Sequence, residues 1–116
     1  MGGTLLHVAA EYGNVEAARL LLARGADVNA GAPVDSEGTG GHTPIFHSVT
    51  QFGDFGLPVT RFLVQNGADL TVRATLPGHY ERPSEVVTCT PFGYARLFPG
   101  FETETVAFLR SLAAPD

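Results

Sequence analysis

The chain has 116 residues, enough for one domain with a modest core. Its 12 acidic and 7 basic residues give a formal net charge of −5, which disfavours nucleic acid as a partner because phosphate binding depends on clustered cations. The single cysteine, Cys89, excludes an internal disulfide, and the absence of a signal-peptide pattern or a membrane-length apolar run predicts a cytoplasmic protein without membrane contact.

The first predicted element is a pair of helices within residues 4–24. Thr4 is placed to cap the first helix through its side-chain oxygen, and Gly13 is placed to end it. Gly25 allows the left-handed conformation that stops the second helix. The second helix carries one apolar stripe at helical spacing, formed by Val15, Ala18, Leu21 and Leu22.

A second helix pair is predicted after residues 31–40, which are rich in glycine and form an irregular, flexible loop in this interpretation. Thr43 is the expected cap, with Pro44 at the first helical position, where a missing N–H costs least. Gly53 and Gly67 are expected to end the two helices. The second helix repeats the stripe with Leu57, Thr60, Leu63 and Val64.

Residues 71–88 differ from the first loop, because both ends of the segment resemble strands. Residues 70–73 and 85–88 have strand character, and Pro77-Gly78 between them is a turn signal. We expect an extended β-like finger with a polar and aromatic tip, consisting of His79, Tyr80, Glu81 and Arg82.

A third, weaker helix pair begins at Thr90-Pro91. Its second helix is predicted near the C-terminus, with acidic Glu102 and Glu104 in the first turn, where the helix dipole favours them. The expected stripe is Thr105, Phe108, Leu109 and Leu112. At the other end of the chain, Leu5, Leu6 and Val8 follow Met1 with nothing before them to cover an apolar face.

These motifs resemble the ankyrin repeat family. The resemblance is carried by TLLHVAA at residues 4–10 with GAD at 25–27, by GHTPIFH at 41–47 with GAD at 67–69, and by TPFGYA at 90–95. The sequence departs from the family pattern at Leu5, which replaces proline, and at Phe46, which replaces histidine. The copies are also widely spaced, at 39 and 47 residues from Thr4 to Thr43 and from Thr43 to Thr90, against about 33 for this repeat.

The resemblance implies an all-α fold, an α-solenoid of about three helix-turn-helix units with long β-hairpin-like finger loops. The chain is then a single domain over residues 1–116. Its predicted parts are repeat 1 at about 2–30, a first finger insertion at 31–40, repeat 2 at about 41–70, a second finger insertion at 71–88 and a degenerate C-terminal repeat at 89–116.

The four histidines and the cysteine are the candidates for metal binding or catalysis. The resemblance gives His7 a structural role, in which its ring bonds backbone and steadies a neighbouring unit, while His47 is expected as a partly buried polar residue. A metal site is disfavoured because the five-residue gap from His42 to His47 crosses a helix start. The alternative function is a small metal- or cysteine-dependent hydrolase that uses His42, His79 and Cys89, but no third catalytic group is apparent, and we expect no enzyme activity and no cofactor.

The resemblance also implies a function, which is binding to a protein partner through the concave face and the fingers. The predicted contact residues are Glu11, Tyr12, His42, Thr50, Gln51, Phe52, His79, Tyr80 and Arg82. Tyr12 is the favoured anchor, because tyrosine supplies a large contact area at low entropy cost. The uncovered N-terminal end has two interpretations: either it adjoins more of a longer repeat protein, which we favour, or another copy covers it by self-association.

Overall fold

The computed structural model describes residues 4–51, 54–79, 82–97 and 103–116, with the side chains of residues 78, 79 and 82–84 left out. Six helices and two strands follow one another in this part of the chain: α1 (Leu5–Glu11), α2 (Val15–Ala23), α3 (Ile45–Ser48), α4 (Leu57–Gln65), β1 (Ala74–His79), β2 (Arg82–Cys89), α5 (Pro91–Ala95) and α6 (Glu104–Ser111).

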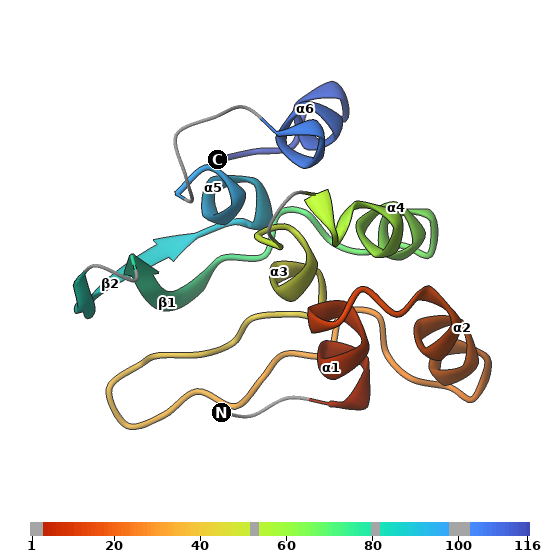
Figure 1. Ribbon diagram of the computed structural model, residues 1–116. Coiled ribbons are helices and arrows are strands. Elements are labelled where there is room, and N and C mark those ends of the chain that lie inside the picture. Colours follow the sequence, from red (N-terminus) through yellow and green to blue (C-terminus); the bar gives the residue numbers. More distant parts are fainter. Residues whose placement is uncertain (1–3, 52–53, 80–81, 98–102) are drawn as a thin grey trace.

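The helices form three pairs that lie side by side. In Figure 1 the first helix of each pair (α1, α3, α5) belongs to an inner column, and the second (α2, α4, α6) belongs to an outer column. The segments that link one pair to the next project from the inner column on the side away from the outer helices (Figure 1). We call residues 31–40 the first finger and residues 71–88 the second finger.

One apolar core runs through all three pairs. Each helix places its apolar stripe toward its neighbours, so that a single cluster includes side chains from every helix and from both strands. The predicted stripe is buried at Ala18, Leu63, Thr105 and Leu109. The prediction that Leu112 belongs to the buried stripe is wrong, because Leu112 is the C-cap residue of α6 and is 42% exposed.

Side-chain caps explain where α1 and α5 begin, but the cap predicted for α3 is wrong. Thr4 accepts hydrogen bonds from Leu6 N and His7 N, and Thr90 accepts one from Gly93 N, as predicted. Thr43 does not cap α3. That helix begins after Pro44 without a side-chain cap, and the buried Thr43 hydroxyl has no partner among the described residues.

The helix ends follow the glycine signals where the structure describes them. Gly13, Gly25 and Gly67 have φ values of +65°, +93° and +92°, in the left-handed region that favours glycine. The expected stop at Gly53 lies outside the described residues, and α3 already ends at Ser48.

The first finger has more order than the irregular loop expected from its glycines. Ala32 N donates to His42 O and Gly41 N donates to Ala32 O, so the two arms of the finger pair with each other. Gly40 then pairs with Thr75 of β1, with Gly40 N 2.8 Å from Thr75 O. Glycine is needed at this junction, since its φ is +127° and a Cβ would collide with the Pro33 carbonyl oxygen.

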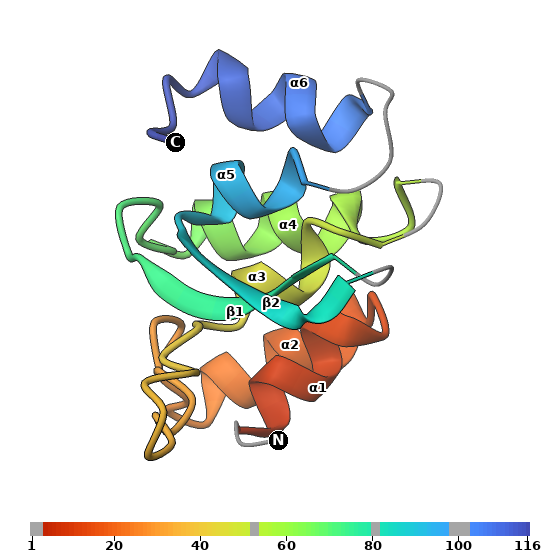
Figure 2. The ribbon, with the colours of Figure 1, turned by 90° about the vertical axis from the view of Figure 1, so that its left-hand side faces the viewer.

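The second finger is a β-hairpin, as expected, but its turn is not where the sequence suggested. Strands β1 and β2 are antiparallel, with Ala74 opposite Cys89 and His79 opposite Arg82. Pro77 and Gly78 therefore lie inside β1, next to an irregularity in the register, and residues 70–73 precede the strand. In a two-stranded sheet both strands are edges, where proline is tolerated. Figure 2 shows this hairpin in front of α3 on the finger side of the molecule.

A side chain from the second pair also caps the last outer helix. The carboxylate of Asp54 accepts hydrogen bonds from Glu104 N (3.1 Å), Thr105 N (3.0 Å) and Thr105 Oγ1 (2.8 Å). These bonds hold the pKa of Asp54 below its usual value, because they outweigh the opposing effect of burial.

We predict that Asp54→Ala lowers the free energy of unfolding by about 1–2 kcal/mol, because the free N–H groups at the start of α6 lose an acceptor. Asp54→Asn is the matched control: it keeps one acceptor and tolerates the φ of 61° at this position, so it should cost less. Urea denaturation followed by circular dichroism measures both, and equal stability of Asp54→Ala and wild type would contradict the assignment.

Candidate functional site

The inner helices and the second finger line an open pocket of about 150 Å³. Its lining residues come from both inner-helix segments and fingers, and they are Glu11, His42, Phe46, His47, Thr50, Leu76 and Tyr94. We call the surface formed by α1, α3, α5 and the fingers around this pocket the concave face. The pocket is thus built from all three helix pairs and from no single one of them.

Equivalent positions of the repeats supply most of this lining. His47 and Tyr94 each stand four residues after the threonine that opens their unit, and Glu11 and Thr50 each stand seven residues after theirs. Residues that are three and four positions apart share one face of a helix. Stacking the units therefore aligns these side chains along the concave face.

A cluster of three histidines lies at the first inter-repeat boundary. The buried His7 ring sits between two backbone groups, with Nδ1 2.9 Å from Thr4 N and Nε2 2.9 Å from His42 O. Its ring centroid is 5.5 Å from that of His42 and 5.4 Å from that of His47. The structural role predicted for His7 is confirmed, because the ring joins its own helix cap to the backbone of the next unit.

Glu11 is held in place at the rim of the pocket. Its Oε1 lies 2.8 Å from His47 Nδ1, and its Oε2 lies 3.3 Å from Gln51 Nε2. Gln51 Nε2 also donates to His47 O at 2.6 Å, which anchors the amide to α3. Because a carboxylate only accepts, the proton of a neutral His47 ring is on Nδ1. About half of the Glu11 side chain remains exposed.

Burial sets the protonation of this cluster. Burial, together with the neighbouring His47 and His7 rings, lowers the pKa of His42 to about 4. Burial also lowers the pKa of His7, against the hydrogen bond to the His42 carbonyl, which raises it. Near neutral pH the His7 and His42 rings are therefore uncharged. Glu11 is then the charged residue of α1.

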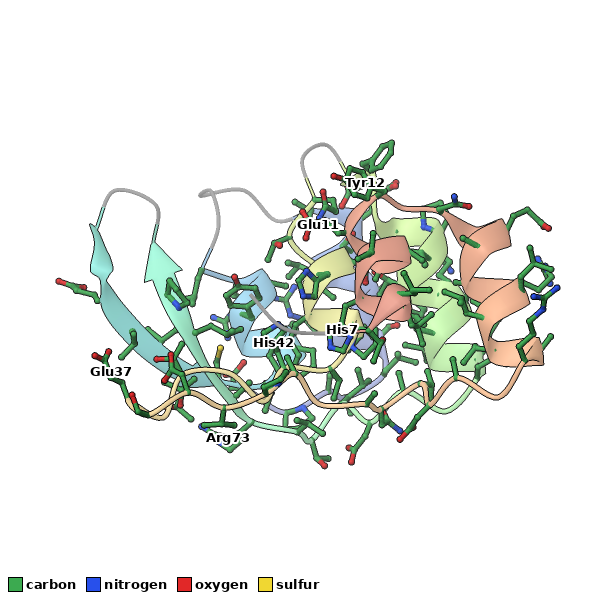
Figure 3. All side chains as sticks on the ribbon, turned by 90° about the horizontal axis from the view of Figure 1, so that it is seen from below. His7, Glu11, Tyr12, Glu37, His42 and Arg73 are labelled. Carbon is green, nitrogen blue, oxygen red and sulfur yellow. The ribbon has the colours of Figure 1, made fainter. Side chains whose placement is uncertain are left out.

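The predicted contact residues divide into three groups. Glu11, His42 and Thr50 line the pocket together, and Gln51 donates a hydrogen bond to the Glu11 carboxylate. Tyr12 lies one residue past the end of α1, is 70% exposed, and is not part of the lining (Figure 3). Phe52 and Tyr80 lie outside the described residues, as do the side chains of His79 and Arg82, whose backbones pair at the end of the hairpin.

Sequence reasoning missed four lining residues. Phe46 and Tyr94 were read only as parts of the repeat signature, and their rings lie 5.9 Å apart between α3 and α5. His47 was expected as a partly buried polar residue, which it is, but not as a wall of the pocket. Leu76 lies in β1 of the second finger, for which the sequence predicts no contact with an inner helix. The shared repeat position of His47 and Tyr94 was the available signal.

The structure gives little support to hydrolytic chemistry. Cys89 is buried, and burial raises the pKa of its thiol against the effect of Arg73, whereas a nucleophilic cysteine needs a lowered pKa. Among the side chains that the structure describes, no three or more His, Cys, Asp or Glu residues are arranged to hold a metal ion. Within the same part of the chain, no helix has the length and apolar character needed to cross a membrane.

We predict that stability falls as the pH drops from about 6.5 towards 4, the interval between the ordinary pKa of histidine and that of folded His42. The folded pKa is the lower one, so the unfolded chain binds the proton more tightly and acid favours unfolding. His42→Gln should flatten this dependence while leaving His7, His47 and Glu11 in place. Thermal unfolding between pH 5 and 8 tests this; an unchanged slope would contradict it.

Comparison with known proteins supports the repeat architecture. A family model described as ankyrin repeats (3 copies) matches residues 1–74, which is more than half of the chain. No curated protein matches the sequence. The matched range contains α1 to α4 and ends at the first residue of β1, so α5 and α6 lie beyond it. The family resemblance inferred from the threonine, proline and glycine motifs is confirmed: the chain belongs to the ankyrin repeat family.

Proposed function

We propose that this chain is a non-catalytic section of an ankyrin solenoid that binds a protein partner through its concave face and fingers. The observation that carries the proposal is the pocket to which all three helix pairs contribute. Ankyrin repeats are in general protein-protein interaction modules. A surface that exists only when the units are stacked fits that role, because it is rigid before the partner arrives and binding then costs little ordering entropy.

The surroundings of the pocket support this choice of surface. Tyr12 and Phe55 are exposed beside the inner column, at 70% and 60%, and both offer large apolar area near polar groups. Asp35 and Glu37 are exposed on the first finger, and Glu85 is exposed on the second. A partner that extends beyond the pocket would meet these aromatic side chains at one side of it and acidic groups on the fingers.

The proposal predicts where selected binders attach. Peptides obtained by display against the immobilised chain should bind the concave face, so Thr50→Arg, which fills the pocket, should weaken them at least about tenfold. Ala23→Arg is the matched control, since it adds the same side chain at an exposed site on outer helix α2. Binding is measured by biolayer interferometry. Equal losses for both variants, or a loss for Ala23→Arg alone, would place the binding surface elsewhere.

A second surface favours self-association. Leu5, Val8 and Tyr12 lie three and four residues apart, from the first residue of α1 to its C-cap, and are 70%, 51% and 70% exposed, whereas Leu6 is only 1% exposed. The expectation of an uncovered apolar face therefore holds for Leu5 and Val8 and is wrong for Leu6. We propose that a second copy covers this stripe, as α3 covers α1 and α5 covers α3 inside the chain.

Light scattering at increasing concentration tests this second surface. We expect a mass above that of the monomer for the wild type and a return to 12.2 kDa for Val8→Glu, which places a charge in the middle of the stripe. The control is Val86→Glu, a change at an exposed valine of the second finger. A wild type that stays monomeric at the highest concentration would exclude the interface.

A further inference from the structure

We propose that the pocket on the concave face receives an arginine side chain of the partner, an inference that rests on the proposed function and assigns the chemistry of its central contact. The geometry points to this class because a braced carboxylate, two aromatic rings and a side-chain-sized cavity meet at one place.

The charge in the lining is negative. Glu11 is the one acidic residue among the seven that line the pocket, the lining contains no lysine or arginine, and the His42 ring is uncharged near neutral pH. A partner carboxylate or phosphate placed here would face Glu11 directly and be repelled. A cation is attracted, and more strongly than on an open surface because part of the solvent is excluded.

The Glu11 carboxylate is positioned before any ligand binds. His47 Nδ1 and Gln51 Nε2 each donate to one of its oxygens, at 2.8 and 3.3 Å. Two carboxylate oxygens have about four acceptor positions, so roughly two remain for incoming donors. This number matches the paired N–H groups that a guanidinium presents to a carboxylate. The fixed position of Glu11 means that little side-chain entropy is lost on binding.

The aromatic lining distinguishes arginine from lysine. Tyr94 is the partly exposed ring of the lining, and Phe46, which is 1% exposed, packs behind it with the two centroids 5.9 Å apart. A planar guanidinium stacks on an accessible ring such as that of Tyr94 and is less strongly hydrated than an ammonium group, so it loses less when it enters a partly apolar pocket. Leu76 of the second finger supplies an apolar wall that suits the methylene stem of the side chain.

The size of the cavity and the overall charge agree with this occupant. A volume of about 150 Å³ corresponds to roughly five water molecules, which is the size of one side-chain head group rather than of a folded element or a nucleotide. The chain carries a net charge of −5, with acidic residues on the fingers, so a basic partner segment is also drawn to this side of the molecule.

The test is a titration of the whole chain at pH 8 with N-acetyl-arginine amide, followed by nuclear magnetic resonance. We expect saturable shifts at Glu11, Thr50 and Tyr94. N-acetyl-citrulline amide, which has nearly the same shape without the charge, should bind at least about tenfold more weakly than the arginine probe. N-acetyl-lysine amide should fall between the two. Equal binding of the citrulline and arginine probes, or shifts confined to other residues, would overturn the proposal.

Two matched variants test whether the arginine probe contacts Glu11. Glu11→Gln should weaken the arginine probe about tenfold, because it removes the charge and keeps an acceptor for His47. Glu16→Gln removes the same charge from the outer helix α2, where Glu16 pairs with Arg19, and should change affinity less than twofold. An unaltered affinity in Glu11→Gln would overturn the assignment. If Glu11→Gln does not fold, the comparison of the citrulline and arginine probes on wild type still settles it.

The outcome also separates this inference from the proposed function. Displayed peptides that are lost in Thr50→Arg yet carry no preferred arginine would support the concave face and overturn the arginine pocket. Peptides that bind elsewhere would overturn the proposed function, while saturable binding of the arginine probe at Glu11 would still support the pocket chemistry. Peptides with one recurrent arginine whose replacement by citrulline abolishes binding would support both.

Discussion

Neighbouring helix pairs bury one another's apolar faces, and the rest of the structure depends on this mutual burial. Leu6, Leu63 and Leu109 belong to three different units, yet each is almost fully buried in one continuous cluster. Burial of a leucine side chain contributes about 1.5–3 kcal/mol, which a short helix pair of this kind lacks when it stands alone. The concave face follows directly, because stacked units bring together the inner helices and the fingers that form the pocket.

Polar and cationic contacts set how the stacked units align. His7 bonds the His42 carbonyl, Asn29 bonds the backbone of both Gly67 and Asp69, and Asp54 caps α6, so each boundary has at least one directional contact. The outer helices repeat a further contact, in which an arginine covers a phenylalanine of the next unit: Arg19 over Phe62, and Arg61 over Phe108. Apolar burial provides the free energy of stacking, and these contacts choose one register among several.

The site was partly accessible from sequence, for a reason that lies in the repeat. Positions such as Glu11, His42 and Thr50 follow from the family pattern, because equivalent positions face the same way in every unit. Leu76 does not follow from it, since the pocket requires the second finger to approach an inner helix of the first unit. That approach depends on the lengthened fingers, which pair with each other through Gly40 and Thr75.

The helices, their caps at Thr4 and Thr90, the stops at Gly13, Gly25 and Gly67 and the family can be read from the sequence, because these depend on interactions within a few residues. Prediction from sequence misplaced the cap at Thr43 and the turn at Pro77-Gly78, where the helix start and the strand register are set by packing against neighbouring units. The bracing of Glu11 by His47 and Gln51, and the meeting of two aromatic rings from different units at one cavity, arise only in the folded chain. Those contacts join residues about 36 to 48 positions apart, and no local preference encodes a distance of that kind.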